Sequence, residues 1–196
     1  MATTLLALSL FVIHMLGITN SAVITNQDFI KSSCEATLYP VRCMESLSGN
    51  ASTIGNNEQQ LAITALSVSM SAAQSLASSV KEIGSTTRMK PRDKNAVQDC
   101  IKLTDDSVES LTQSIKELGL VGKPNEKDLI HINNILTSIS AASTDQSTCL
   151  EGLNELNVDA KLKADISRGV VDVSELISNA LTLVDRYASK FRKTNS

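Results

Sequence analysis

Apolar residues recur at alternating steps of three and four along four long segments of the chain, at about 58–83, 91–118, 126–153 and 159–191. A 3.5-residue repeat kept over three or more heptads is typical of helices that pack in a left-handed bundle at roughly 20°. Connections of about six to eight residues make consecutive helices antiparallel neighbours. The pattern therefore predicts an all-α fold, an antiparallel up-down-up-down four-helix bundle.

The repeat also indicates which positions are buried. The first seam runs from Ala62 to Ile83 and the fourth from Ile166 to Phe191. The second and third seams are expected at Val97, Ile101, Thr104, Val108, Leu111, Ile115 and Leu118, and at Leu129, Ile132, Leu136, Ile139, Ser143, Gln146, Leu150 and Leu153. Polar residues interrupt the seams, and we expect them near the ends of the bundle, where water reaches them. They are Ser69, Thr104, Ser143 and Gln146.

Residues that favour helix ends mark the boundaries of these segments. Asn57 before the first segment and Asn125 before the third are predicted N-caps. Gly84 is expected to end the first helix, and Pro91 suits the first turn of the second.

A short helical hairpin is predicted ahead of the bundle. Residues 28–38 and 40–47 form two helical pieces that separate at Pro40, because the residue before a proline disfavours the helical conformation. The polar stretch 49–57 is expected to be a linker. Within it, Asn50 begins an Asn-Ala-Ser acceptor motif for N-glycosylation.

The N-terminus has the features of a secretory signal peptide. An uncharged, mostly apolar run from Leu5 to Leu16 is too short to span a bilayer and suits the central region of such a signal. Thr19 and Ser21 precede a cleavage site, and a buried N-terminal helix is the alternative interpretation. The expected division of the chain is a signal peptide at 1–21 and one exported, soluble domain at 22–196, with hairpin and linker at 22–56 and bundle at 57–196.

Export changes the interpretation of the four cysteines. An even number in an oxidising compartment favours two disulfides over a metal site, which would need closer cysteine spacing or several histidines. Four cysteines allow three pairings, and the sequence alone does not choose among them. Closure of the shorter loops favours Cys34–Cys43 and Cys100–Cys149, and the second bridge requires the same antiparallel arrangement as the short connections.

Composition argues against most enzymatic and nucleic-acid functions. The 196-residue chain has a formal net charge of −3 and only 3% aromatic residues, so neither a phosphate-binding surface nor a base-stacking platform is expected. One histidine, His131, follows the signal peptide, with Asp128 three residues before it, and no hydrolase, metalloprotease or phosphate-loop motif accompanies it. We therefore predict no enzyme activity, no cofactor, no metal site and no membrane or nucleic-acid partner.

Four motifs, taken together, point to a known family. They are Cys34-Glu-Ala-Thr-Leu-Tyr-Pro-x-x-Cys43; Asp99-Cys100-Ile101 followed by Asp105-Asp106; Ile139-Ser-Ala-Ala-x-Thr144-x-x-x-Thr148-Cys149; and Val173-Ser-Glu-Leu-Ile-Ser178-Asn179-Ala180-Leu181. In this order they resemble the plant invertase and pectin methylesterase inhibitors, over essentially the whole chain after the signal peptide. The resemblance implies a four-helix bundle with an N-terminal helical hairpin, in which the first cysteine pairs with the second and the third with the fourth.

The resemblance also implies inhibition of a secreted carbohydrate-active enzyme through a one-to-one complex. The ending Ser178-Asn179-Ala180-Leu181 looks more like the methylesterase branch, and the Pro-Lys-Phe segment that the invertase branch often uses is absent from the last helix. We therefore expect a free-standing inhibitor that covers the pectin-binding cleft of pectin methylesterase in the apoplast or cell wall and is monomeric when free. The alternatives are an inhibitor of cell-wall or vacuolar acid invertase and a helical signalling ligand, although the short connections disfavour the latter.

For the methylesterase branch, the resemblance places the partner contacts on the second and third bundle helices, around the third and fourth cysteines. The corresponding positions are Lys102, Asp106, Glu109, Thr148 and Glu151. Three positions depart from the family pattern: Lys102 replaces a usual acid, Ser138 a common aromatic and Ser143 a usual apolar residue. Because the lysine inverts a charge on the expected contact face, we expect it to alter partner choice or binding strength.

Overall fold

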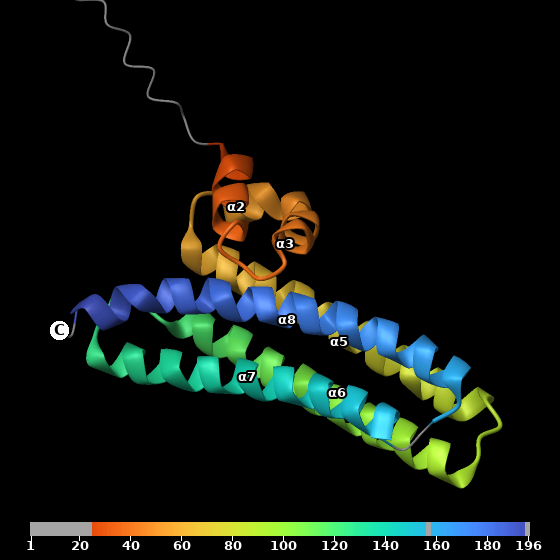
Figure 1. The fold of residues 1–196 in the computed structure, drawn as a ribbon. Helices are drawn as coiled ribbons and strands as arrows, with labels where there is room; N and C mark the ends of the chain where they lie inside the picture. Colours follow the sequence, from red (N-terminus) through yellow and green to blue (C-terminus); the bar gives the residue numbers. More distant parts are fainter. Residues whose placement is uncertain (1–24, 156–157, 195–196) are drawn as a thin grey trace, which may run out of the picture.

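Four long antiparallel helices form the body of the molecule, as Figure 1 shows. In this computed structural model, which describes residues 25–155 and 158–194, they are α5 (Glu58–Thr86), α6 (Pro91–Leu120), α7 (Glu126–Glu155) and α8 (Ala160–Thr194). Each helix packs against its neighbour in the chain, and α5 also packs against α8, which closes the bundle. The predicted four-helix bundle is confirmed. The predicted signal peptide at 1–21 lies outside the described residues.

The predicted helix starts are confirmed, and one predicted end is wrong. The side chain of Asn57 accepts a hydrogen bond from the backbone N–H of Gln60 at 3.1 Å, as an N-cap does. Asn125 accepts one from Asp128 N–H at 2.9 Å, and Pro91 begins α6. Gly84 does not end α5, which continues to Thr86. A Cβ on this glycine would lie 3.4 Å from Val97 Cγ1, so Gly84 lies inside α5 and faces α6.

Between residue 25 and the bundle, the structure has three short helices and a 3₁₀ turn. They are α2 (Asn26–Cys34), α3 (Pro40–Leu47), η1 (Ser48–Asn50) and α4 (Ala51–Ile54). The first piece, expected at 28–38, is therefore wrong at its end, because the Thr37 hydroxyl donates to the Cys34 carbonyl at 2.8 Å and closes the helix there. The stretch 49–57 is also wrong as a linker, since most of it is helical up to Gly55, whose positive φ of 56° ends α4.

These N-terminal helices lie across α5 and α8 and leave the α6–α7 side uncovered (Figure 1). Ile30 of α2, Leu47 of α3 and Ile54 of α4 are almost fully buried. The Cys34–Cys43 disulfide joins α2 to α3, and the Cys100–Cys149 disulfide joins α6 to α7. Both pairings that the resemblance implied are confirmed.

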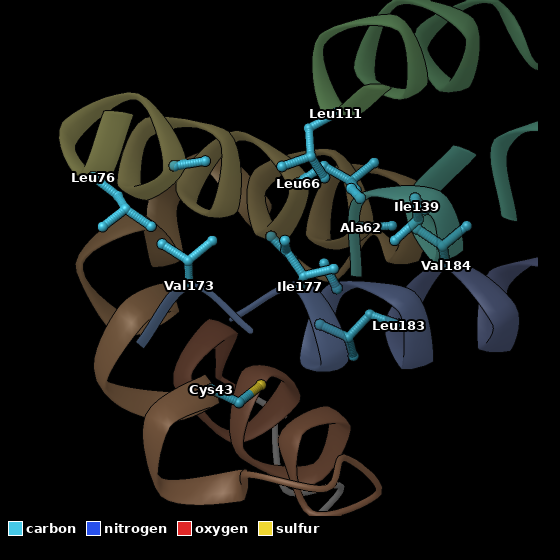
Figure 2. Close-up of a cluster of buried hydrophobic side chains, with 14 of the residues drawn as sticks. Cys43, Ala62, Leu66, Leu76, Leu111, Ile139, Val173, Ile177, Leu183 and Val184 are labelled. Carbon is cyan, nitrogen blue, oxygen red and sulfur yellow. The ribbon is translucent and has the colours of Figure 1, made fainter. Parts of the chain in front are cut away.

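The core of the bundle is built from all four long helices. Figure 2 shows Leu66 of α5, Leu111 of α6, Ile139 of α7 and Ile177 of α8 gathered in one cluster. Although α5 is long and apolar enough to cross a membrane, half of its most apolar stretch is buried inside the protein. We therefore interpret α5 as a core helix.

The seams of α5 and α8 are nearly as predicted, and so is every second position of the α6 and α7 seams. The remaining predicted positions of α6 and α7 are displaced by one residue, for example from Ile101 to Cys100 and from Leu136 to Ile135. The buried stripe of α6 consists of Val97, Cys100, Thr104, Ser107, Leu111, Ser114 and Leu118. That of α7 consists of Ile132, Ile135, Ile139, Ala142, Gln146, Cys149 and Leu153. Small side chains and the disulfide lie on these stripes, so the two helices approach closely there. The larger predicted residues turn to the edge and are half-buried, as Ile101, Val108, Ile115, Leu129, Leu136 and Leu150 are.

The expectation that polar seam residues lie near water is wrong for three of the four. Ser69, Thr104 and Gln146 are completely buried, and Ser143 is half-buried. The hydroxyl of Ser69 donates to the Ala65 carbonyl at 2.9 Å, and that of Thr104 to the Cys100 carbonyl at 2.8 Å. Each hydroxyl satisfies its donor within its own helix, which allows the group to be buried.

Candidate functional site

The predicted partner-binding residues lie on two adjacent helices whose register the Cys100–Cys149 bridge holds, with a Cα–Cα distance of 4.7 Å. On α6, Lys102, Asp106 and Glu109 are spaced at i, i+4 and i+7, so they form one stripe. On α7, Thr148 and Glu151 are spaced at i, i+3 and also share a face. Asp106 is partly exposed and the other four are exposed, so all five are accessible. We name these five residues and Asp145, described below, the acidic face.

Lys102 is directed along its own helix. Its Nζ lies 2.6 Å from Asp106 Oδ2, one helical turn away. The hydrogen bond and charge of Asp106 raise the pKa of Lys102 above its ordinary value. The residue that departs from the family pattern therefore partly neutralises Asp106. Glu109, one turn further, has no cationic side chain within 4.0 Å in the described part of the chain.

Asp145 of α7 belongs to this face, although the motifs did not predict it. Its carboxylate is close enough to Asp106 and Lys102 to feel both charges. Burial raises the pKa of Asp145, and the Asp106 carboxylate raises it further, while a hydrogen bond from Ser107 and the charge of Lys102 act in the opposite direction. A signal was present in the sequence: if Cys100 and Cys149 face each other on antiparallel helices, residues about one turn inward on each helix also become neighbours.

A buried polar contact lies beneath the acidic face. Gln146 Nε2 donates to the Ser107 hydroxyl oxygen at 2.7 Å, and both side chains are completely buried. The Ser107 hydroxyl lies 3.0 Å from the Leu103 carbonyl of its own helix and 3.2 Å from the Ala142 carbonyl of α7. The contact therefore links α6 to α7 through side chain and backbone. Together with the disulfide, it holds the two helices in one register.

Within residues 25–155 and 158–194, the side chain of His131 has no hydrogen bond or ion pair. It is half-buried near the start of α7, beside a hollow that Glu117 and Lys127 also line. The nearby Asp128 carboxylate accepts hydrogen bonds from the Gly122 N–H at 3.1 Å and from Asn125 Nδ2 at 2.9 Å. It thus holds the α6–α7 connection, whereas a general base would need a carboxylate that orients the imidazole. Among the described residues, no group of three or more potential metal ligands is found.

Comparison with known proteins identifies the family. The profile described as "Plant invertase/pectin methylesterase inhibitor" matches residues 28–183. The chain belongs to this family. Two curated relatives from Arabidopsis thaliana match it along most of their length: pectinesterase inhibitor 9, 38% identical over 93% of this chain and 95% of the relative, and pectinesterase inhibitor 11, 37% identical over 84% and 82%.

The fold agrees with that of a solved family member. The crystal structure of a mutant form of a pectin methylesterase inhibitor from Arabidopsis superposes with a TM-score of 0.63 at 20% identity, over 80% of this chain and 95% of that one. The profile match and the two relatives confirm the family resemblance in the motifs, and the solved structure confirms the fold. The two curated relatives are named as inhibitors, which confirms the prediction that this family member is not an enzyme.

Proposed function

We propose that the protein inhibits pectin methylesterase by covering its pectin-binding cleft in a one-to-one complex. The observation that carries the proposal is the similarity to two proteins named pectinesterase inhibitors, which extends over more than four-fifths of each. The uncovered α6–α7 side supplies a surface for such a complex. The proposed contacts are Lys102, Asp106, Glu109, Thr148 and Glu151, to which we add Asp145.

The mechanism we propose is steric occlusion by a rigid surface. A standard stable interface buries about 800 Å² on each partner. The Cys100–Cys149 bridge and the buried Ser107–Gln146 contact favour binding, because helices already held in register lose little conformational entropy on association. The carboxylates of Glu109, Asp145 and Glu151 would complement a basic rim on the enzyme and accelerate association.

The cellular setting belongs to the same proposal. Cleavage after residue 21 would release the protein to the apoplast or cell wall, where the two disulfides persist. A glycan at Asn50, the last residue of η1, would sit on the N-terminal helices, which pack against α5 and α8. Such a glycan would leave the α6–α7 side free. We further propose that the free protein is monomeric.

A titration tests the proposal. The oxidised protein from residue 22 is added in steps to a pectin methylesterase and, separately, to an acid invertase, with de-esterification by the protein alone measured as a control. We expect methylesterase activity to fall linearly to an end point at one equivalent. Loss of invertase activity with an unaffected methylesterase would replace this proposal by the invertase alternative. No effect on either enzyme would exclude the whole inhibitory function.

A further inference from the structure

A run of cations lies where α5 connects to α6. Within seven residues the chain carries four basic side chains, all exposed: Arg88, Lys90, Arg92 and Lys94. The single acidic residue of the run, Asp93, is buried, with 3% of its surface exposed. This local excess of positive charge contrasts with the chain as a whole, whose formal net charge is −3. The run therefore makes a basic site on an otherwise slightly acidic protein.

The run borders a hollow of about 220 Å³ between the end of α5 and the start of α6. Met89, Val97 and Ile101 form the apolar part of its wall. Ser85, Gln98 and Lys94 form the polar part. Among the described residues, no carboxylate lies within 4.0 Å of Arg88, Lys90 or Lys94. Lys81, which also lines the hollow, differs because its Nζ lies 2.8 Å from Asp105. Of the three uncompensated cations, Lys94 lines the hollow, and Arg88 and Lys90 lie in the adjoining α5–α6 connection. We name the hollow together with these three cations the basic hollow.

The basic hollow is separate from the acidic face although both involve α6. The α5–α6 connection, yellow-green in Figure 1, lies at the end of the bundle opposite the C-terminus. Lys94 and Asp106 are twelve residues apart on α6, which corresponds to about 18 Å along the helix axis. The hollow itself extends along α6 to Ile101, which precedes Lys102, whereas the three cations lie toward the start of the helix. A ligand held by these cations therefore leaves Asp106 and the residues beyond it accessible.

We propose that the basic hollow binds de-esterified pectin, a linear polymer whose uronic acid rings each carry a carboxylate. Clusters of lysine and arginine within five to eight residues are typical of sites for polyanionic glycans such as heparin. Sugar carboxylates are ionised above about pH 4, whereas methyl-esterified rings carry no charge. The choice of polymer rests on the proposed function, because the proposed target enzyme removes methyl esters and leaves such carboxylates behind.

This binding would concentrate the inhibitor where its target has acted. Attachment to the polymer raises the local concentration of a second binding module nearby, here the acidic face. Since the three cations are exposed, the attraction is screened by salt and depends on ionic strength.

Retention on immobilised polygalacturonate tests the inference without any enzyme present. The oxidised protein is applied at low salt with a calcium chelator and eluted with a salt gradient, in parallel with highly methyl-esterified pectin. The test variant is Arg88→Gln/Lys90→Gln/Lys94→Gln. Arg92 is kept, because its Nε lies 3.6 Å from Asp93. The matched control, Lys116→Gln/Lys123→Gln/Lys127→Gln, removes the same charge from three exposed lysines at the other end of α6, in the α6–α7 connection and at the start of α7.

We expect the native protein and the control to bind polygalacturonate, and the test variant to bind about tenfold more weakly or worse, since each exposed charge pair contributes a factor of about two to five. Equal weakening of both variants, equal binding to the esterified polymer, or binding to anionic phospholipid vesicles but not to polygalacturonate would each overturn the inference. Inhibition of the methylesterase is titrated separately on a small soluble ester. Lost retention with intact inhibition, or the reverse, therefore shows which proposal has failed.

Discussion

The side-chain amide of Asn179 in α8 forms two hydrogen bonds with the backbone of Tyr39, in the turn between α2 and α3. The Tyr39 N–H donates to Asn179 Oδ1 at 3.1 Å, and Asn179 Nδ2 donates to the Tyr39 carbonyl at 2.9 Å. Only 3% of the Asn179 surface is exposed. One buried amide therefore binds both backbone polar groups of Tyr39, the N-cap of α3, whose carbonyl also accepts from the Cys43 N–H at 2.9 Å, and it fixes the hairpin to the bundle.

Asn179→Ala should loosen this attachment. The substitution leaves the Tyr39 N–H without its acceptor, which costs about 1–3 kcal/mol of unfolding free energy, whereas the Tyr39 carbonyl keeps the Cys43 N–H as a donor at 2.9 Å. Hydrogen exchange of residues 25–54 should accelerate more than exchange in α6 and α7. Ser178→Ala, at the neighbouring half-buried position, serves as control and should change stability by less than about 0.5 kcal/mol. Equal destabilisation by both variants would contradict a specific role for the amide.

The Ser107–Gln146 contact should behave as a coupled pair. Ser107→Ala deprives the buried Gln146 amide of its acceptor and is expected to cost about 1–3 kcal/mol. Gln146→Leu removes the amide and its Oε1, which has no hydrogen-bond partner in the described structure, so it should cost less. In a double-mutant cycle measured by urea unfolding, the double variant should be more stable than Ser107→Ala alone. Additive effects would show that the two side chains act independently.

The two disulfides should contribute unequally to stability. On the chain-entropy account, a bridge stabilises by closing a loop in the unfolded chain. Cys100–Cys149 spans 49 residues and Cys34–Cys43 spans 9, so their removal as Ala pairs should cost about 4 and about 3 kcal/mol respectively. Chemical denaturation of the two double variants measures both values. A reversed order would mean that side-chain packing around the bridge in the folded protein outweighs the entropy of the loop.

Asp145 should make stability depend on pH. Because burial and Asp106 raise its pKa in the folded protein, the folded state binds more protons than the unfolded state over this pH range. The free energy of unfolding should then decrease as pH rises through this pKa. Asp145→Asn removes the effect and should raise stability at neutral pH relative to the native protein. Thermal unfolding from pH 3 to 8 measures this, with exposed Asp165→Asn as control; parallel curves for native protein and Asp145→Asn would contradict it.

The carboxylates of the acidic face should matter for the rate of association with the enzyme. Asp106→Asn/Glu109→Gln keeps the side-chain shapes and removes two charges, so association at low salt should slow by about two- to tenfold. The difference should shrink at high salt, because screening weakens the attraction. The matched control is Glu82→Gln/Asp165→Asn, on α5 and α8. Surface plasmon resonance at several salt concentrations provides the rates, and an unchanged association rate would remove the electrostatic part of the mechanism.

Local sequence signals determined much of the fold. The Asn57 and Asn125 caps and the Pro91 start are short-range features, and their physical effects act within a few residues. The two cysteine pairings followed from the family resemblance, and one of them joins residues 49 positions apart. The α8 seam was also predicted, because every one of its positions is apolar and buried.

The errors arose where helix packing overrides the hydrophobic pattern. The small residues Ser107 and Ala142 let α6 and α7 approach along a stripe that a search for large apolar residues overlooks. Gln146 is buried because Ser107 on another helix accepts its hydrogen bond, a contact that no single-helix pattern reveals. Asp145 was missed for the same reason, since its neighbours Asp106 and Lys102 belong to another helix. Gly84 likewise suggests a helix end when the sequence is considered alone, whereas in the structure it lies inside α5 and faces α6.

The placement of the N-terminal helices makes the α5–α8 side of the bundle different from the α6–α7 side. Because these helices pack mainly on the α5 and α8 side among the long helices, a fluorophore or surface anchor attached near Asn26 would point away from α6 and α7. Such a handle would allow the protein to be displayed in one orientation on a sensor chip or fused to a reporter without obstructing its opposite side.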